Sequence, residues 1–139
     1  MMVNHRIMRL VFAFGIGLLA SYCSYQWITD PDRAARRAVE EGVVREARLV
    51  LESYVGTERA LEISDPLNRV REAGKVYIYP APYGWEVSGQ YRRDGEKAWH
   101  AYLMQLDPDA RLLSLTVKDD DPRLRERADE DPRFSAGTP

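Results

Sequence analysis

The sequence predicts an α+β protein that an N-terminal helix tethers to a membrane. Three observations lead to this fold class: an uncharged apolar run at 10–28, a helical stripe of apolar residues over 31–55, and an alternation of period two from 75 to 118. With 139 residues, the chain has room for one ordinary domain beyond the anchor. The expected organisation is a basic N-terminal tail at 1–9, a transmembrane anchor at 10–28, a small α+β domain at 30–130 and a disordered tail at 131–139.

The anchor is predicted from length, composition and flanks. Residues 10–28 form a run of 19 without a charged side chain, which is about 28 Å long as a helix and matches a hydrocarbon core of roughly 30 Å. Aromatic residues gather at its C-terminal end, where headgroups favour them. Arg6 and Arg9 precede it. This pattern predicts a single-pass signal anchor in the lipid bilayer, with the N-terminus cytoplasmic and the domain periplasmic.

Two alternatives to a retained anchor remain. A cleaved signal peptide needs small residues before its cut site, and Ser21-Tyr22-Cys23 fits this poorly. A lipoprotein needs a small residue just before the lipidated cysteine, where Tyr22 stands. The retained anchor is therefore favoured.

Small residues recur every four positions along one face of the anchor, at Ala13, Gly17 and Ser21. Such spacing lets helix backbones approach closely in a membrane. It indicates a packing face for another membrane helix, although small residues are common in any spanning helix.

The first element of the domain is an amphipathic helix over 31–55. Asp30 and Pro31 form a typical helix start, and apolar residues follow at steps of three and four up to Tyr54. Thr57 is expected to cap a turn. A second, short helix is expected to start at Ser64 or Asp65 and end before Gly74.

Strands follow at 75–79, 85–92, 99–105 and 113–118, and Asp94-Gly95 is a strong hairpin signal. They predict a meander of four antiparallel strands, whose apolar face the amphipathic helix covers. In outline this element order resembles cystatin or NTF2-type domains, a likeness that implies nothing about function. A short C-terminal helix from Asp121-Pro122 to about Ala128 and a frayed tail complete the chain.

Little in the sequence points to chemistry. His100 has no second histidine in the domain, so it is interpreted as a rim residue, and Asp119-Asp120-Asp121 as a solvated connection whose last residue caps a helix. After residue 29 the chain holds 18 basic and 22 acidic side chains, a balance that disfavours nucleic-acid binding. We expect no enzyme activity, cofactor or metal.

The aromatic residues are the main candidates for binding. One set is expected in the core: Trp85, Tyr91 and Trp99. The other set is expected on the outer face as a partner-binding surface: Tyr77, Tyr79, Tyr83 and Tyr102. Tyrosine is enriched where surfaces bind, although cross-strand packing is the plainer interpretation.

These features predict a membrane-anchored, non-enzymatic accessory, assembly or scaffolding domain that binds another membrane or envelope protein. The alternative is a periplasmic domain that binds a small ligand or lipid in a pocket between helix and sheet. A cavity lined by Tyr54, Trp85 and Leu103 would favour this alternative, and a filled core with an outer aromatic patch would favour docking.

Overall fold

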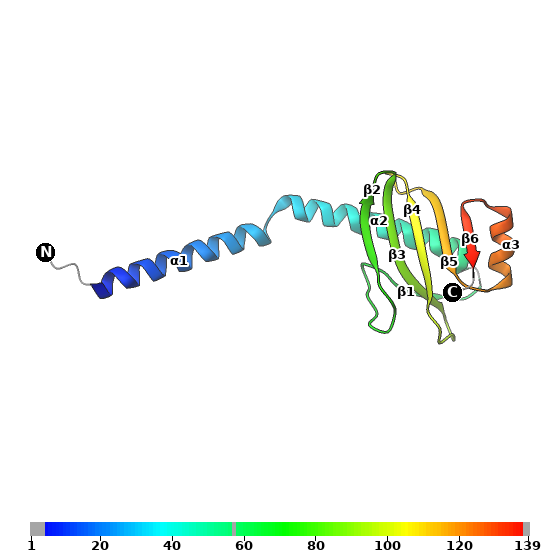
Figure 1. Ribbon diagram of the computed structural model, residues 1–139, viewed down its shortest axis with the longest axis horizontal. Coiled ribbons are helices and arrows are strands. Elements are labelled where there is room, and N and C mark those ends of the chain that lie inside the picture. Colours follow the sequence, from blue (N-terminus) through cyan, green and yellow to red (C-terminus); the bar gives the residue numbers. More distant parts are fainter. Residues whose placement is uncertain (1–4, 57, 138–139) are drawn as a thin grey trace. The chain divides into compact units, whose positions relative to one another are not determined.

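The computed structural model describes residues 5–56 and 58–137, and divides the chain into two compact units, Met1–Ala38 and Val39–Pro139. The elements in chain order are α1 (His5–Ile28), α2 (Pro31–Val55), β1 (Leu61–Ser64), β2 (Tyr77–Ala81), β3 (Gly84–Arg93), β4 (His100–Leu106), β5 (Leu112–Lys118), α3 (Pro122–Glu130) and β6 (Phe134–Gly137) (Figure 1). The fold class is α+β, as the sequence predicts. The first four residues of the basic tail, the proposed Thr57 cap and the last two residues of the tail lie outside the described residues.

The first unit contains α1 and the start of α2. Within the described residues, α1 belongs to the one helical stretch that is long and apolar enough to cross a membrane, and all of its side chains are exposed. Residues 5–9, expected in the tail, are its first turns. The Asp30 carboxylate accepts the backbone N–H of Asp32 at 3.1 Å, and α2 begins at Pro31, which confirms the predicted helix start.

The second unit is built on a mixed sheet of six strands in the order β1-β3-β4-β5-β6, with β2 also paired to β3. The four predicted strands correspond to β2, β3, β4 and β5, and they pair antiparallel in sequence order. β1 and β2 share one edge of β3, because β2 pairs with its first half and β1 with its second half. β6 pairs parallel to β5 after the α3 crossover.

The part of α2 in the second unit covers one face of this sheet, as its amphipathic pattern predicts (Figure 1). The core contains apolar side chains from the helix, from the three central strands and from the C-terminal segment: Val43, Ala47, Leu51, Val55, Val87, Tyr91, Met104, Leu106, Leu115, Val117, Leu124 and Phe134. The opposite face of the sheet is called the outer face below.

The prediction of a short helix that starts at Ser64 or Asp65 is wrong. Leu61–Ser64 is the strand β1, and a turn follows it. Asp65 does act as a cap, but within this turn, where its carboxylate accepts the amides of Leu67 and Asn68 at 2.9 Å. The same buried carboxylate forms a two-point ion pair with Arg48 of α2, so both of its oxygens hold the turn against the core helix.

The disordered tail predicted from residue 131 is also wrong for the residues described. α3 forms as expected, with Asp121 accepting the Arg123 amide at 3.0 Å, but it is followed by strand β6. Phe134 is 3% exposed, and its ring centre lies 5.0 Å from that of Tyr54. The burial of Phe134 therefore holds β6 in place, although the composition of this segment is otherwise typical of a disordered tail.

The predicted faces of β4 are reversed. In antiparallel pairs, residues opposite each other share a face, and Tyr102 lies opposite Gly89, whose strand neighbours Val87 and Tyr91 are in the core. Tyr102 is therefore buried, at 3% exposure, and Trp99 lies outside the core. Gly89 makes room for it, since an added Cβ there would lie 2.7 Å from the Tyr102 hydroxyl.

Candidate functional site

Three of the four tyrosines predicted as a partner-binding surface meet on the outer face around one carboxylate. Tyr79 of β2 lies opposite Glu86 of β3, Tyr77 is two residues before it, and Tyr83 lies in the turn that joins the strands. The hydroxyls of Tyr79 and Tyr83 donate to Glu86 at 2.6 Å each. The Tyr77 hydroxyl donates to the same carboxylate at 3.2 Å. We call these four residues the tyrosine surface.

The hydrogen bonds of the tyrosine surface fix its charge. Donation from Tyr79 and Tyr83 lowers the pKa of Glu86, so this carboxylate is ionised at neutral pH. The bond to Glu86, followed by desolvation, raises the pKa of Tyr79 to about 12, so its hydroxyl stays protonated. The surface therefore carries one negative charge that neutral donors hold in place.

The rings of the tyrosine surface remain accessible. Tyr77 and Tyr79 are 38% and 43% exposed, and they stack with ring centres 5.4 Å apart. Tyr102, the fourth predicted member, is absent from the surface because it lies in the core. Glu86 is the member that sequence reasoning missed, and the signal for it was its place on the polar side of β3, opposite a tyrosine.

The predicted helix-packing face lies on α1, in the other unit. Ser21 donates its hydroxyl to the Gly17 carbonyl at 2.9 Å, so this polar group is satisfied within its own helix. A Cβ built on Gly17 would meet nothing within 4 Å. Ala13, like the whole of α1, is exposed, and its role in helix packing stays a prediction.

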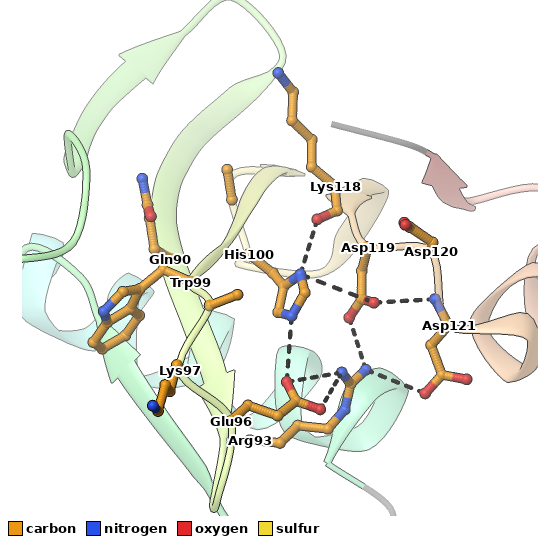
Figure 2. Close-up of a pocket in the computed structure, with 12 residues that line it drawn as sticks. Gln90, Arg93, Glu96, Lys97, Trp99, His100, Lys118, Asp119, Asp120 and Asp121 are labelled. Carbon is orange, nitrogen blue, oxygen red and sulfur yellow. Dashed lines mark hydrogen bonds and ion pairs between the residues drawn. The ribbon is translucent and has the colours of Figure 1, made fainter.

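A second cluster, of charged residues, lines a pocket of about 910 Å³ at the end of the sheet where β4 begins and β5 ends. Figure 2 shows the Arg93 guanidinium between Glu96 on one side and Asp119 and Asp121 on the other. Arg93 bonds to Asp119 at 2.8 Å, and the buried Tyr91 hydroxyl donates to the same carboxylate at 2.6 Å. We call this cluster the sheet-end network.

His100 joins the sheet-end network through both ring nitrogens. Nδ1 lies 3.2 Å from the Lys118 carbonyl oxygen, and Nε2 lies 3.3 Å from the Glu96 carboxylate (Figure 2). Both neighbours are acceptors only, so the protonated imidazolium satisfies both contacts and the neutral ring satisfies one. His100 is half-buried, in agreement with a rim position.

Asp119 differs from the solvated residue that the sequence predicts. Burial alone raises the pKa of this carboxyl group, but hydrogen bonds from Tyr91, the Asp121 amide and Arg93 outweigh burial and leave the pKa below its ordinary value. In the described part of the chain, each buried side-chain nitrogen or oxygen has a hydrogen-bond partner. The sheet-end network therefore satisfies itself, which is typical of a structural cluster.

Across residues 5–56 and 58–137, no group of three or more His, Cys, Asp or Glu side chains is placed to hold an ion.

Comparisons of the chain with protein-family models, with curated proteins and with solved structures found no match. The tyrosine surface is both accessible and held in place by hydrogen bonds.

Proposed function

We propose that this chain is a single-pass membrane protein whose periplasmic domain docks on another membrane or envelope protein, as a non-enzymatic accessory or assembly factor. The observation that carries the proposal is the tyrosine surface. Exposed aromatic rings offer contact area at a small entropic cost, and here hydrogen bonds to Glu86 already hold the ring positions. A partner would therefore bind a preformed surface, which reduces the ordering cost of binding.

The tether in this proposal is α1. Its apolar side chains are exposed along the whole described helix, an arrangement that suits lipid and not water. Trp27 lies at its C-terminal end, with the Arg33 guanidinium 4.4 Å from the ring centre. An aromatic ring with a cation above it suits the headgroup level. The basic residues Arg6 and Arg9 favour a cytoplasmic N-terminus.

The ligand-pocket alternative has less support. It requires Tyr54, Trp85 and Leu103 around one cavity between helix and sheet. Leu103 lies opposite Ser88 on the outer face, while Tyr54 packs against Phe134 near the end of α2. Side chains from α2 and the sheet fill the space between them with one continuous apolar cluster.

The proposal is tested by a mild-detergent pulldown of the full-length protein from its native membrane, read by mass spectrometry. A stoichiometric membrane or envelope partner is expected, and the double substitution Tyr79→Ser and Tyr83→Ser should remove it. Leu113→Ser is the matched control, because Leu113 is also 43% exposed but lies outside the tyrosine surface. Loss of the partner with the control as well, or retention with the double variant, would contradict docking through this surface.

A second bait separates the domain from the anchor. Its first 29 residues are replaced by an unrelated transmembrane helix, which removes the Ala13, Gly17 and Ser21 face. Retention of the partner would assign the contact to the domain. Loss of the partner in this bait alone would assign the contact to the anchor.

A further inference from the structure

We infer that the tyrosine surface recognises an arginine side chain on an extended segment of the partner, and that Glu86 is the residue that selects it. This inference rests on the docking function proposed above and names the chemistry of the partner. It follows from three properties of the surface: an unbalanced negative charge, exposed aromatic faces beside that charge, and a free strand edge.

The charge of Glu86 has no counter-ion in the described part of the chain. Its hydrogen-bond donors are neutral tyrosine hydroxyls, which fix the carboxylate and leave its charge in place. Glu62 makes a useful comparison, because it lies on the same face of the sheet and pairs with Arg92 at 2.6 Å. The fold therefore neutralises one carboxylate on this face internally and leaves the other for a partner.

The aromatic rings favour a planar cation at this position. Tyr77 and Tyr79 present exposed ring faces beside the carboxylate, and such faces attract cations. A guanidinium stacks flat on an aromatic ring, which an ammonium group does less well, and one of its N–H groups can donate to the Glu86 oxygen that accepts only the Tyr83 hydroxyl. The chain already uses this stacking elsewhere, with Arg92 4.6 Å from the centre of the Trp99 ring.

The extended form of the partner segment follows from β2. This strand pairs with β3 on one side, and among the described residues no strand pairs with its other side. Pro80 has no N–H to donate, so an added segment would pair with the part of β2 that precedes it, Tyr77–Tyr79. A segment that adds to this edge takes strand conformation, and every second side chain of it faces the tyrosine surface. An added strand lies about 4.8 Å from β2, so an arginine next to Tyr79 is long enough to reach across the ring toward Glu86.

The test uses the full chain in detergent and two fluorescent seven-residue peptides of alternating threonine and valine. One has a central arginine, and the other has citrulline there, which keeps the shape and removes the charge. Dissociation constants are measured by fluorescence anisotropy at physiological ionic strength. The arginine peptide should bind about tenfold more tightly than the citrulline peptide, as expected for one ion pair assisted by a ring.

Glu86→Gln should abolish this preference, while Glu62→Gln, the same change of charge on the same face, should keep it. Equal binding of the two peptides to the wild-type protein would overturn the inference, and so would an equal loss in both variants, which would indicate bulk electrostatics. The pulldown distinguishes the two proposals. If the partner is lost with the Tyr79 and Tyr83 double variant but still binds Glu86→Gln, the docking function stands and the recognition of arginine is wrong.

Discussion

At the scale of single residues, Asp119 is the clearest test of the sheet-end network. It is 3% exposed and holds Arg93 and Tyr91 by hydrogen bonds. Asp119→Asn removes the nearest of the three carboxylate charges around the buried Arg93 guanidinium, so we expect a loss of about 2 kcal/mol in unfolding free energy at neutral pH. Asp120→Asn, a change at the exposed neighbour, should cost less than about 0.5 kcal/mol. Urea unfolding in mild detergent, followed by tryptophan fluorescence, measures both.

The wild-type protein and Asp119→Asn should also differ in how their stability depends on pH. Because the folded-state pKa of Asp119 is lowered, its contribution to stability is present above the ordinary aspartate pKa of about 4 and is lost as pH falls through the folded value. The difference between wild type and Asp119→Asn should therefore be largest near neutral pH and shrink on acidification below about pH 4. A difference that stays constant down to pH 3 would indicate a loss of packing instead of charge.

Another prediction at this scale concerns Gly89, a position without room for a side chain. A Cβ added there would lie 2.6 Å from the Ser64 carbonyl oxygen as well as against Tyr102, so the backbone of β1 would have to shift. Gly89→Ala should therefore destabilise the domain by about 2 kcal/mol. Gly42→Ala is the control, since that site in α2 is open and helical and should gain roughly 0.5 to 1 kcal/mol. Equal effects in the two variants would contradict the packing of Tyr102 over Gly89.

At this scale, the buried face of β3 was predicted correctly from the sequence, but the buried face of β4 was not. The alternation that buries Val87 and Tyr91 is visible in the sequence, but the face of Tyr102 depends on pairing across the Asp94-Gly95 turn. The observed register places even-numbered residues of β4 opposite odd-numbered residues of β3, and a two-residue turn at Asp94-Gly95 would have predicted the same parity, so the signal was present. Glu86 needed more than a pattern, because three hydroxyls reach it from β2 and from the turn after it.

At the scale of elements, the C-terminal strand β6 is the main addition to the predicted fold. Phe134→Ala should cost about 3 kcal/mol of unfolding free energy, because it removes a buried ring that packs on Tyr54. Ser135→Ala, at the next and exposed position, should change stability by less than about 0.5 kcal/mol. Comparable urea midpoints for the two variants would mean that the last strand is not part of the cooperative core.

The elements found from the sequence have strong local signals, and those missed do not. α2 has a cap, a proline at its first position and a long apolar stripe, and both of its ends match the predicted ones. β1 and β6 are four residues long, too short for a period of two to stand out from its flanks. Each forms because a longer strand offers an edge, which is a tertiary cause that local sequence does not carry.

At the scale of the whole molecule, composition predicts where the anchor ends and the domain begins, but it does not predict the binding surface of the domain. The uncharged run of residues 10–28 and the acidic balance that follows are visible without a structure. The tyrosine surface is not, because its residues come together only when β2 folds back on β3 through a two-residue turn. The candidate site could thus be predicted as a set of tyrosines, but not as a charge held among them.

The last prediction concerns the tether and its orientation. If α1 spans the membrane with its N-terminus inside, the full-length protein should stay in the membrane pellet after alkaline carbonate washing, because its run of 19 uncharged residues is held by lipid and not by charge. In spheroplasts of a Gram-negative host, added protease should digest the domain while the membrane is intact. Replacing Leu18 and Leu19 by arginine should release the protein from the membrane, since each charge near a helix centre costs about 3 kcal/mol on insertion. Arginine at the exposed Val39 is the matched control and should leave the protein in the pellet. Digestion only after lysis would invert the orientation, and carbonate release of the wild type would turn the tether into a peripheral or cleaved segment.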